Sequence, residues 1–174
     1  YLSRTIVGLR VSLIVGLTAV AFQLVIGITV GALSGYFGGW VDNVLMRITD
    51  IFLSIPGFLL LLILTGILGG SLIALVFAIG ALNWMTVARL VRAEILSLKA
   101  REYIVAGRSI GVSDFRLIVV YLLPNTAASI IVAATLAVPS AILTESALSF
   151  LGLGVPPPHA SLGKMMEEAQ QWIR

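Results

Sequence analysis

The sequence predicts an all-α membrane protein, built as a bundle of several transmembrane helices. Of its 174 residues, 59% are hydrophobic and only 11% are charged, and the mean hydropathy is +1.10. Three long blocks contain no Asp, Glu, Lys or Arg, at residues 11–41, 51–88 and 117–144. A membrane-crossing helix needs about 20 mostly apolar residues, whereas a helix at the surface of a soluble domain has a polar face. The blocks also lack the strict alternation of barrel strands, which favours helices.

The four expected spans follow from the lengths of these blocks. Block 51–88 is too long for one helix and contains Gly69-Gly70-Ser71, which is a turn sequence, so it is divided there. The helix before this turn must begin near Leu45 to reach spanning length, which leaves Arg47 and Asp50 near its end. Long polar side chains at such an end can reach the lipid headgroups. The predicted spans are residues 11–33, 45–67, 72–91 and 119–141.

The positive charge is concentrated in one loop and predicts which side of the membrane it occupies. Segment 89–116 holds six of the 11 Lys and Arg residues. Short loops rich in Lys and Arg stay in the cytoplasm, so this loop is expected to be cytoplasmic. Four spans then put both chain ends outside. The sequence begins with Tyr1 and shows no signal peptide, so an N-terminus outside the membrane implies a further span before it. The amphipathic segment Lys164–Arg174 also ends without a terminator. We therefore expect at least one further span at each end.

Within the charged loop, the spacing predicts two helices separated by a glycine turn. Leu96, Ala100, Tyr103, Gly107 and Ile110 recur at helical spacing and form one predicted stripe. Periodicity alone fits two interpretations equally well. One is a bracket that transmits a push into the bilayer, and the other is an amphipathic hairpin that binds anionic lipid.

The sequence after that stripe predicts how the two helices are joined. Gly111 is expected to end the first helix, Ser113 to cap the second, and Asp114 to complement its dipole. The second helix should begin at Phe115 and continue into the last span, with a bend at Pro124.

The same segment resembles the cytoplasmic "EAA" loop of ABC importer permeases. That pattern is Glu-Ala-Ala, three residues, Gly, nine residues, Ile, one residue, Leu-Pro. Aligned on Gly111, this chain has Val105-Ala106-Gly107, then Tyr121, then Leu123-Pro124. The triplet departs from the pattern at Val105 and Gly107, and we interpret Glu102 as a candidate replacement for the missing carboxylate.

Three further segments extend the resemblance over roughly residues 2–172. Gly35 to Asp42 (GYFGGWVD), Ala88 to Arg92 (ARLVR), and Glu145 to Val155 (ESALSFLGLGV) followed by Pro157-Pro158 are similar to segments of dipeptide, oligopeptide and nickel permeases. The resemblance implies the second permease chain of a bacterial importer of peptides or nickel, in the inner membrane. It implies a single permease domain over 1–174, with four of six spans present and a coupling loop at 89–118.

The resemblance also implies partners and a docking surface. The partners are a homologous permease subunit, two cytoplasmic ATPase subunits that bind ATP and Mg, an external substrate-binding protein, and membrane lipid. No cofactor is expected in this chain and no nucleic acid is expected as a partner. The lack of His and Met clusters favours peptides over nickel. The implied ATPase-docking residues are Arg101, Glu102, Val105, Ala106, Gly107, Gly111, Val112, Ser113 and Asp114.

The remaining candidate residues are few. Pro56, Pro124 and Pro139 are predicted hinges or kinks, which neighbouring helices can tolerate. Asn83 and Glu145 are candidates for the translocation path, although an interhelical hydrogen bond explains Asn83 equally well and a structural hydrogen-bonded role is favoured for Glu145.

Enzymatic chemistry is not predicted. The chain lacks a phosphate-binding Gly-x-x-x-x-Gly-Lys-Ser/Thr loop and cysteine, and its one histidine, His159, has no acidic neighbour, so neither ATP hydrolysis nor a metal site is expected. The alternative functions are a passive channel or secondary transporter, and a lipid-interacting membrane scaffold. A channel or transporter would need intramembrane charges or broken helices, and a membrane enzyme would need a cluster of catalytic side chains.

Overall fold

A computed structural model describes residues 2–68, 71–155 and 161–172, and every regular element in these ranges is a helix. The chain divides into two compact units. One comprises residues 24–54 and 84–134, and the other comprises residues 1–23, 55–83 and 135–174. The long helices α1 (Leu2–Phe37) and α8 (Leu123–Phe150) contribute residues to both.

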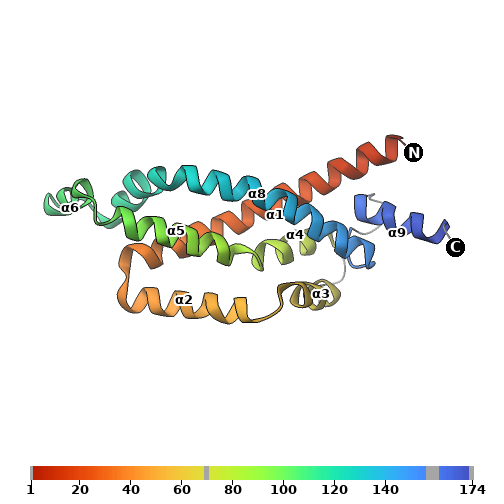
Figure 1. Ribbon diagram of the computed structural model, residues 1–174, viewed down its shortest axis with the longest axis horizontal. Helices are drawn as coiled ribbons and strands as arrows, with labels where there is room; N and C mark the ends of the chain where they lie inside the picture. Colours follow the sequence, from red (N-terminus) through yellow and green to blue (C-terminus); the bar gives the residue numbers. More distant parts are fainter. Residues whose placement is uncertain (1, 69–70, 156–160, 173–174) are drawn as a thin grey trace. The chain divides into compact units, whose positions relative to one another are not determined.

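The unit of residues 24–54 and 84–134 is organised around the second half of α1. It also contains α2 (Gly39–Ser54), α5 (Trp84–Leu98), α6 (Glu102–Ser109), α7 (Asp114–Arg116), the π-helical turn η1 (Leu117–Leu122) and the start of α8. Figure 1 shows α2 running alongside α5. Its main apolar core consists of Ala32, Tyr36, Val87, Val91, Ile95, Ile104, Leu117, Ile118 and Leu122.

Two glycines of α1 let it approach α5 at backbone distance. A Cβ added at Gly31 would lie 2.5 Å from the carbonyl oxygen of Ala88, and one added at Gly27 would lie 2.7 Å from Val87 Cβ. Neither distance is compatible with a side chain. The Gly-x-x-x-Gly pair is therefore a helix-packing contact, which small residues at this spacing make possible.

The unit of residues 1–23, 55–83 and 135–174 contains α3 (Gly57–Ile67), α4 (Leu72–Ala81) and α9 (Leu162–Trp172), with the first part of α1 and the last part of α8. Phe22 and Phe77 pack edge to face with ring centroids 4.7 Å apart. Ser71 caps α4, because its Oγ accepts a hydrogen bond of 3.0 Å from the N–H of Ala74. The turn predicted before Leu72 therefore does separate two helices, although Gly69 and Gly70 lie outside the described residues.

The predicted multi-span helical fold is confirmed. The first and last helices are longer than the predicted spans, and the two middle spans are each interrupted. Among the described residues, Arg4–Phe37, Leu72–Leu98 and Asp114–Phe150 are each long and apolar enough to cross a membrane. A fourth span exists if α2 and α3 are counted as one broken span. The kink predicted at Pro56 within the span 45–67 is a complete break, because α2 ends at Ser54 and α3 begins at Gly57. Pro56 has no N–H and disfavours the helical conformation at Ile55, so the chain must start α3 anew.

A second break lies inside the expected span 72–91. The chain turns at Leu82 and Asn83 between α4 and α5, and the side chain of Asn83 donates a 2.7 Å hydrogen bond to the Ile79 carbonyl. Asn83 therefore satisfies a backbone carbonyl at the end of α4. It does so from an exposed turn rather than from the middle of a continuous helix.

Candidate functional site

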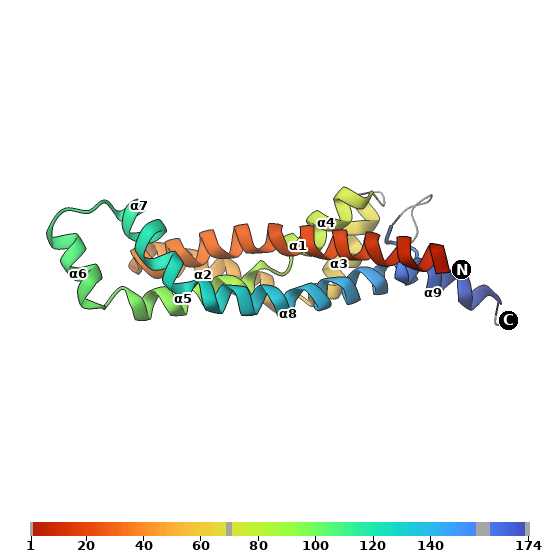
Figure 2. The same cartoon turned by 90° about the horizontal axis from the view of Figure 1, so that it is seen from above.

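The predicted glycine turn is present and joins α6 to α7 in a compact elbow, which we define as residues 102–116. Figure 2 shows α6 beyond the end of α5, with the chain turning back through α7. Gly111 has φ +81°, a left-handed conformation that residues with a Cβ rarely adopt. The N–H of Gly111 donates to Arg108 O and that of Val112 to Gly107 O, both at 3.0 Å. These bonds satisfy the last carbonyls of α6 and make the turn rigid.

The second arm of the elbow continues into α8, as predicted. Ser113 occupies the position before α7, but its side chain makes no capping hydrogen bond, so that part of the prediction was wrong. Between α7 and α8 the helix widens into η1, and the N–H of Leu123 bonds to the carbonyl five residues back, at Ile118. Pro124 follows at once as the second residue of α8. A wider turn suits this position, because proline supplies no N–H to the preceding carbonyls.

The five residues that the periodicity placed on one stripe do not lie on one helix. α5 ends at Leu98 and α6 begins at Glu102, so the stripe from Leu96 to Ile110 is not on one continuous helix. The buried residue of α6 is Ile104, which is fully inaccessible, whereas Ile110 is 82% exposed. The predicted stripe is therefore divided between two helices, because the chain breaks between Leu98 and Glu102.

Two large apolar side chains stand exposed at the tip of the elbow. Ile110 and Phe115 flank the turn at Gly111, with 82% and 77% of their surfaces accessible. The sequence analysis did not single out either residue as a contact. Their positions next to Gly111 and Asp114, which were both predicted to dock the ATPase, could have identified them from the sequence. Apolar side chains this exposed at the tip of a rigid turn are suited to insertion into a partner protein.

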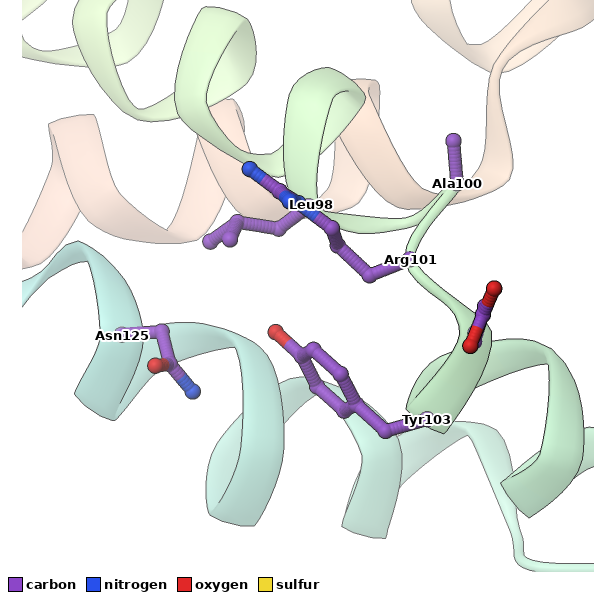
Figure 3. A pocket seen from close by; sticks show the side chains of 6 residues that line it. Leu98, Ala100, Arg101, Tyr103 and Asn125 are labelled. Carbon is purple, nitrogen blue, oxygen red and sulfur yellow. The ribbon is translucent and has the colours of Figure 1, made fainter.

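All nine predicted docking residues fall within or next to the elbow. Most are exposed, and Gly107 and Val112 are half-buried. A Cβ at Gly107 would lie 3.1 Å from Leu117 Cδ2. The EAA pattern has Ala at this position, and this chain has Gly where α6 packs closely on η1. An open cleft of about 640 Å³ borders this surface (Figure 3). The cleft is lined by Leu98, Ala100, Arg101, Glu102, Tyr103 and Asn125.

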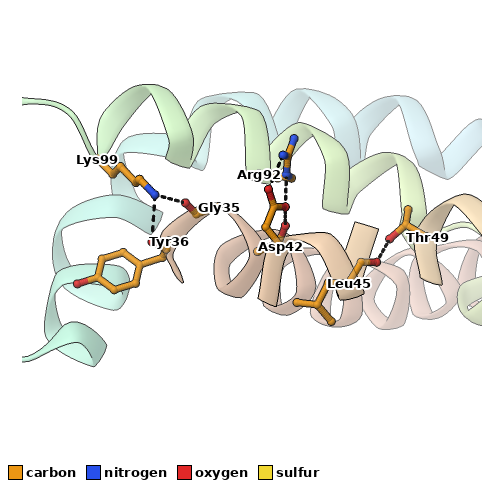
Figure 4. A network of polar contacts seen from close by, with 8 residues as sticks. Gly35, Tyr36, Asp42, Leu45, Thr49, Arg92 and Lys99 are labelled. Carbon is orange, nitrogen blue, oxygen red and sulfur yellow. Dashed lines mark hydrogen bonds and ion pairs between the residues drawn. The ribbon is translucent and has the colours of Figure 1, made fainter. Parts of the chain in front are cut away.

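The elbow is held to the end of α1 by polar contacts. The hydroxyl of Tyr36 donates a hydrogen bond to Asp114 Oδ1, and the guanidinium carbon of Arg108 lies 4.8 Å from the centre of the Tyr36 ring. Lys99 Nζ donates to the carbonyls of Gly35 and Tyr36 at 3.2 and 3.3 Å (Figure 4). A lysine at this place complements the negative end of the helix dipole.

A bidentate ion pair joins α2 to α5 in the same unit. Arg92 donates from Nε and Nη2 to the two carboxylate oxygens of Asp42, at 2.5 and 2.6 Å (Figure 4). Ser34 also donates to Asp42. The side chains of Arg92 and Asp42 are 32% and 16% exposed, whereas those of the neighbouring pair Arg89–Asp50 are 53% and 51% exposed. The segments GYFGGWVD and ARLVR, which both carry the family resemblance, therefore each supply one partner of this ion pair.

Glu145 lies at the centre of a buried cluster of hydroxyl groups in the other unit. Its side chain is fully inaccessible, and it accepts hydrogen bonds from Ser12 Oγ at 2.8 Å and Ser149 Oγ at 2.6 Å. Ser149 Oγ in turn accepts from Ser161 Oγ and from the N–H of Val155, both at 3.2 Å. Glu145 thus links α1 to the end of α8, and this arrangement agrees with the favoured structural role.

The remaining predicted sites can be placed briefly. Pro56 lies in the break between α2 and α3, and Pro139 lies inside α8. Within residues 2–68, 71–155 and 161–172, no group of three or more His, Asp or Glu side chains is arranged to hold a metal ion. His159 lies outside the described residues.

Several apolar helices that can span a bilayer, with one polar elbow, define a multi-span membrane protein. The family model for the inner membrane component of binding-protein-dependent transport systems matches residues 27–173, and the chain belongs to that family. The predicted family and membrane location are thereby confirmed.

Similar proteins include peptide permeases from several bacteria. The chain is 41% identical to the oligopeptide transport system permease protein OppC of Bacillus subtilis, over 95% of this chain and 54% of that protein. It is 41% identical to the dipeptide permease protein DppC of the same organism, over 95% of this chain and 52% of that protein. It is also 41% identical to OppC of Mycobacterium bovis, over 96% and 58%. The chain spans about half the length of these relatives.

Proposed function

We propose that this chain is the permease subunit of an ATP-driven importer of di- or oligopeptides, and that the elbow receives a cytoplasmic ATPase subunit. Membership of the family and the printed functions of the similar permeases support the transport role. The observation that carries the docking role is the pair of exposed side chains, Ile110 and Phe115, on a turn closed by backbone hydrogen bonds. In this proposal ATP and Mg bind to the partner subunits.

The chemistry of the elbow supports a protein partner over a lipid surface. Glu102, Arg108 and Asp114 lie on the elbow and Arg101 immediately precedes it, so both signs of charge are presented in one region. A surface that binds anionic headgroups is enriched in Lys and Arg alone. A protein interface typically combines a few exposed apolar anchors with a mixed polar rim, which is the arrangement here.

The proposal extends to the rest of the complex and to topology. A homologous permease subunit would pair with this chain, and a binding protein would deliver peptide from outside. Segment 89–118 would be the cytoplasmic coupling loop of a single permease domain over 1–174. Exposed apolar side chains such as Val25, Ile63 and Leu143, at 65%, 58% and 70% exposure, suit contact with lipid or with another apolar helix.

The test removes the two apolar anchors and measures assembly with the ATPase. Ile110→Ala and Phe115→Ala in the transporter, co-expressed with its partner subunits, are expected to lower the amount of co-purified ATPase at least about ten-fold when combined, as for interface hot spots. Phe58→Ala is the matched control, because Phe58 is also exposed, at 43%, but lies on α3.

Two measurements separate docking from misfolding. Because both side chains are exposed, the double variant should keep the unfolding temperature of the wild type in detergent. Uptake of a labelled tripeptide into proteoliposomes should fall together with ATPase recovery. If the double variant still binds the ATPase and imports peptide at the wild-type rate, the elbow is not the docking site.

A further inference from the structure

Tyr36 is a buried tyrosine at the end of α1 that contacts both arms of the elbow. Its side chain is only 4% exposed and belongs to the apolar core of its unit. Its hydroxyl bonds to Asp114, the first residue of α7, and its ring lies under the guanidinium of Arg108, in the last turn of α6. One side chain therefore contacts the chain on either side of Gly111.

The backbone at Tyr36 also makes contacts outside α1. Lys99 Nζ bonds to the carbonyls of Gly35 and Tyr36, and α1 ends immediately afterwards, where Gly38 has φ +66° (Figure 4). The Tyr36 ring also packs edge to face on Phe37, with centroids 5.2 Å apart. The end of α1 is thus also held to the segment that joins α5 to the elbow.

Packing alone does not account for this tyrosine. A phenylalanine would fill the same core, because the neighbours Ile104, Leu117 and Leu122 are all apolar. The additional hydroxyl reaches a carboxylate on α7, and hydrogen bonds to charged groups are stronger than neutral ones. A phenylalanine ring would also keep the contact with the guanidinium of Arg108, so the bond to Asp114 is the contact that only the hydroxyl supplies.

We propose that Tyr36 is a positioning residue that joins both arms of the elbow to the end of α1, so that a displacement of the elbow is passed to α1. This inference rests on the proposed function, because it requires the elbow to be moved by an ATPase. Without the contacts of Tyr36, the elbow would remain attached to η1 and α8 through the chain and through Ile104. The end of α1 would then move less when the elbow moves.

Site-directed labels can test this directly, because the chain has no cysteine. One spin label is placed on the elbow at Ser109→Cys and another, in a separate sample, on α1 at Leu33→Cys; both sites are exposed. The transporter is studied with its partner subunits, with and without ATP. In the wild type, ATP should change the spectra of both labels. In Tyr36→Phe, the elbow label should still respond, and the response of the α1 label should be reduced, because the bond to Asp114 is lost while the ring contact with Arg108 remains.

The matched control is Tyr121→Phe, which removes the hydroxyl of a tyrosine that is 37% exposed on η1. This control should leave both responses intact. Asp114→Asn, which replaces the charged acceptor of the Tyr36 hydroxyl with a neutral amide oxygen, should weaken the α1 response. The double variant with Tyr36→Phe should be no worse than Tyr36→Phe alone, because both substitutions act on the same hydrogen bond.

The outcomes distinguish the two hypotheses. A full ATP response at Leu33 in Tyr36→Phe would overturn the role of Tyr36 while leaving the proposed function intact. Effects of Tyr36→Phe and Asp114→Asn that add independently would also overturn it. A wild-type elbow label that does not respond to ATP, in a complex that binds no ATPase, would instead overturn the proposed function.

Discussion

Two acidic side chains organise polar contacts in the two units, and they are held in different ways. Asp42 is paired with the guanidinium of Arg92, and both side chains remain partly exposed. Glu145 is fully buried, and the hydrogen bonds that reach it come from serine hydroxyls. The first arrangement is a strong but partly solvated ion pair, and the second is a buried network.

The difference indicates how readily each contact can open. When a partly exposed ion pair separates, water can solvate both charges, so the loss is moderate. When the buried cluster opens, Glu145, Ser12 and Ser149 lose their hydrogen-bond partners together, and a buried polar group without a partner is costly. We therefore expect the Glu145 cluster to be a fixed structural contact, while the Asp42–Arg92 pair can tolerate movement between α2 and α5.

The largest effect is expected from breaking the buried cluster. Glu145→Ala should lower the free energy of unfolding in detergent by about 3 kcal/mol, because it leaves two buried hydroxyls without an acceptor and creates a cavity. Glu145→Gln is the control, because it keeps one carbonyl oxygen as an acceptor and should cost about 1 kcal/mol. Equal losses for the two variants would show that the hydroxyl contacts are unimportant.

A moderate effect is expected from the ion pair. A double-mutant cycle with Arg92→Met and Asp42→Asn should give a coupling free energy of about 1.5–3 kcal/mol, as for hydrogen bonds to charged groups. The matched cycle uses Arg89→Met and Asp50→Asn, whose more exposed side chains should couple by less than about 1 kcal/mol. Chemical unfolding in detergent measures both cycles. If Arg89–Asp50 couples as strongly as Asp42–Arg92, the difference in exposure does not decide the strength of these ion pairs.

The smallest effect concerns two serines that precede helices. Ser71 in the unit of Glu145 caps α4, so Ser71→Ala should cost about 1 kcal/mol. Ser113 in the unit of Asp42 makes no such bond, and the neighbouring Asp114 is engaged with Tyr36, so Ser113→Ala should change stability by less than about 0.5 kcal/mol. Thermal unfolding of the two variants tests this order. A larger loss at Ser113 would mean that its hydroxyl caps α7 after all.

The parts of the fold that could be predicted depend on local chemistry. Charge-free blocks longer than about 20 residues predict spans because a bilayer cannot solvate charged groups cheaply. Gly111 predicts the end of α6 because the left-handed conformation is open to glycine, and its φ of +81° confirms that prediction. The break at Pro56 had a local signal as well, but it was interpreted as a kink in one continuous helix.

The inward face of the elbow could not be predicted in the same way. Ile104 and Ile110 are equally apolar, yet one is fully buried and the other is 82% exposed. Helical spacing placed Ile110 on one stripe with Leu96 because it assumed one helix from Leu96 onward. The backbone instead breaks after Leu98, and only the packing of Ile104 with Leu117 and Leu122 selects the orientation of α6.

By itself, the sequence determined that this chain is helical and membrane-embedded, and where its principal turn lies, because solvation cost and backbone sterics act on each segment separately. Tertiary structure alone decided that Tyr36 contacts Arg108 and Asp114, that Asp42 pairs with Arg92, and that Ser12 meets Glu145. Each of these contacts joins residues far apart in the chain. Their formation depends on how helices pack, which no local pattern specifies.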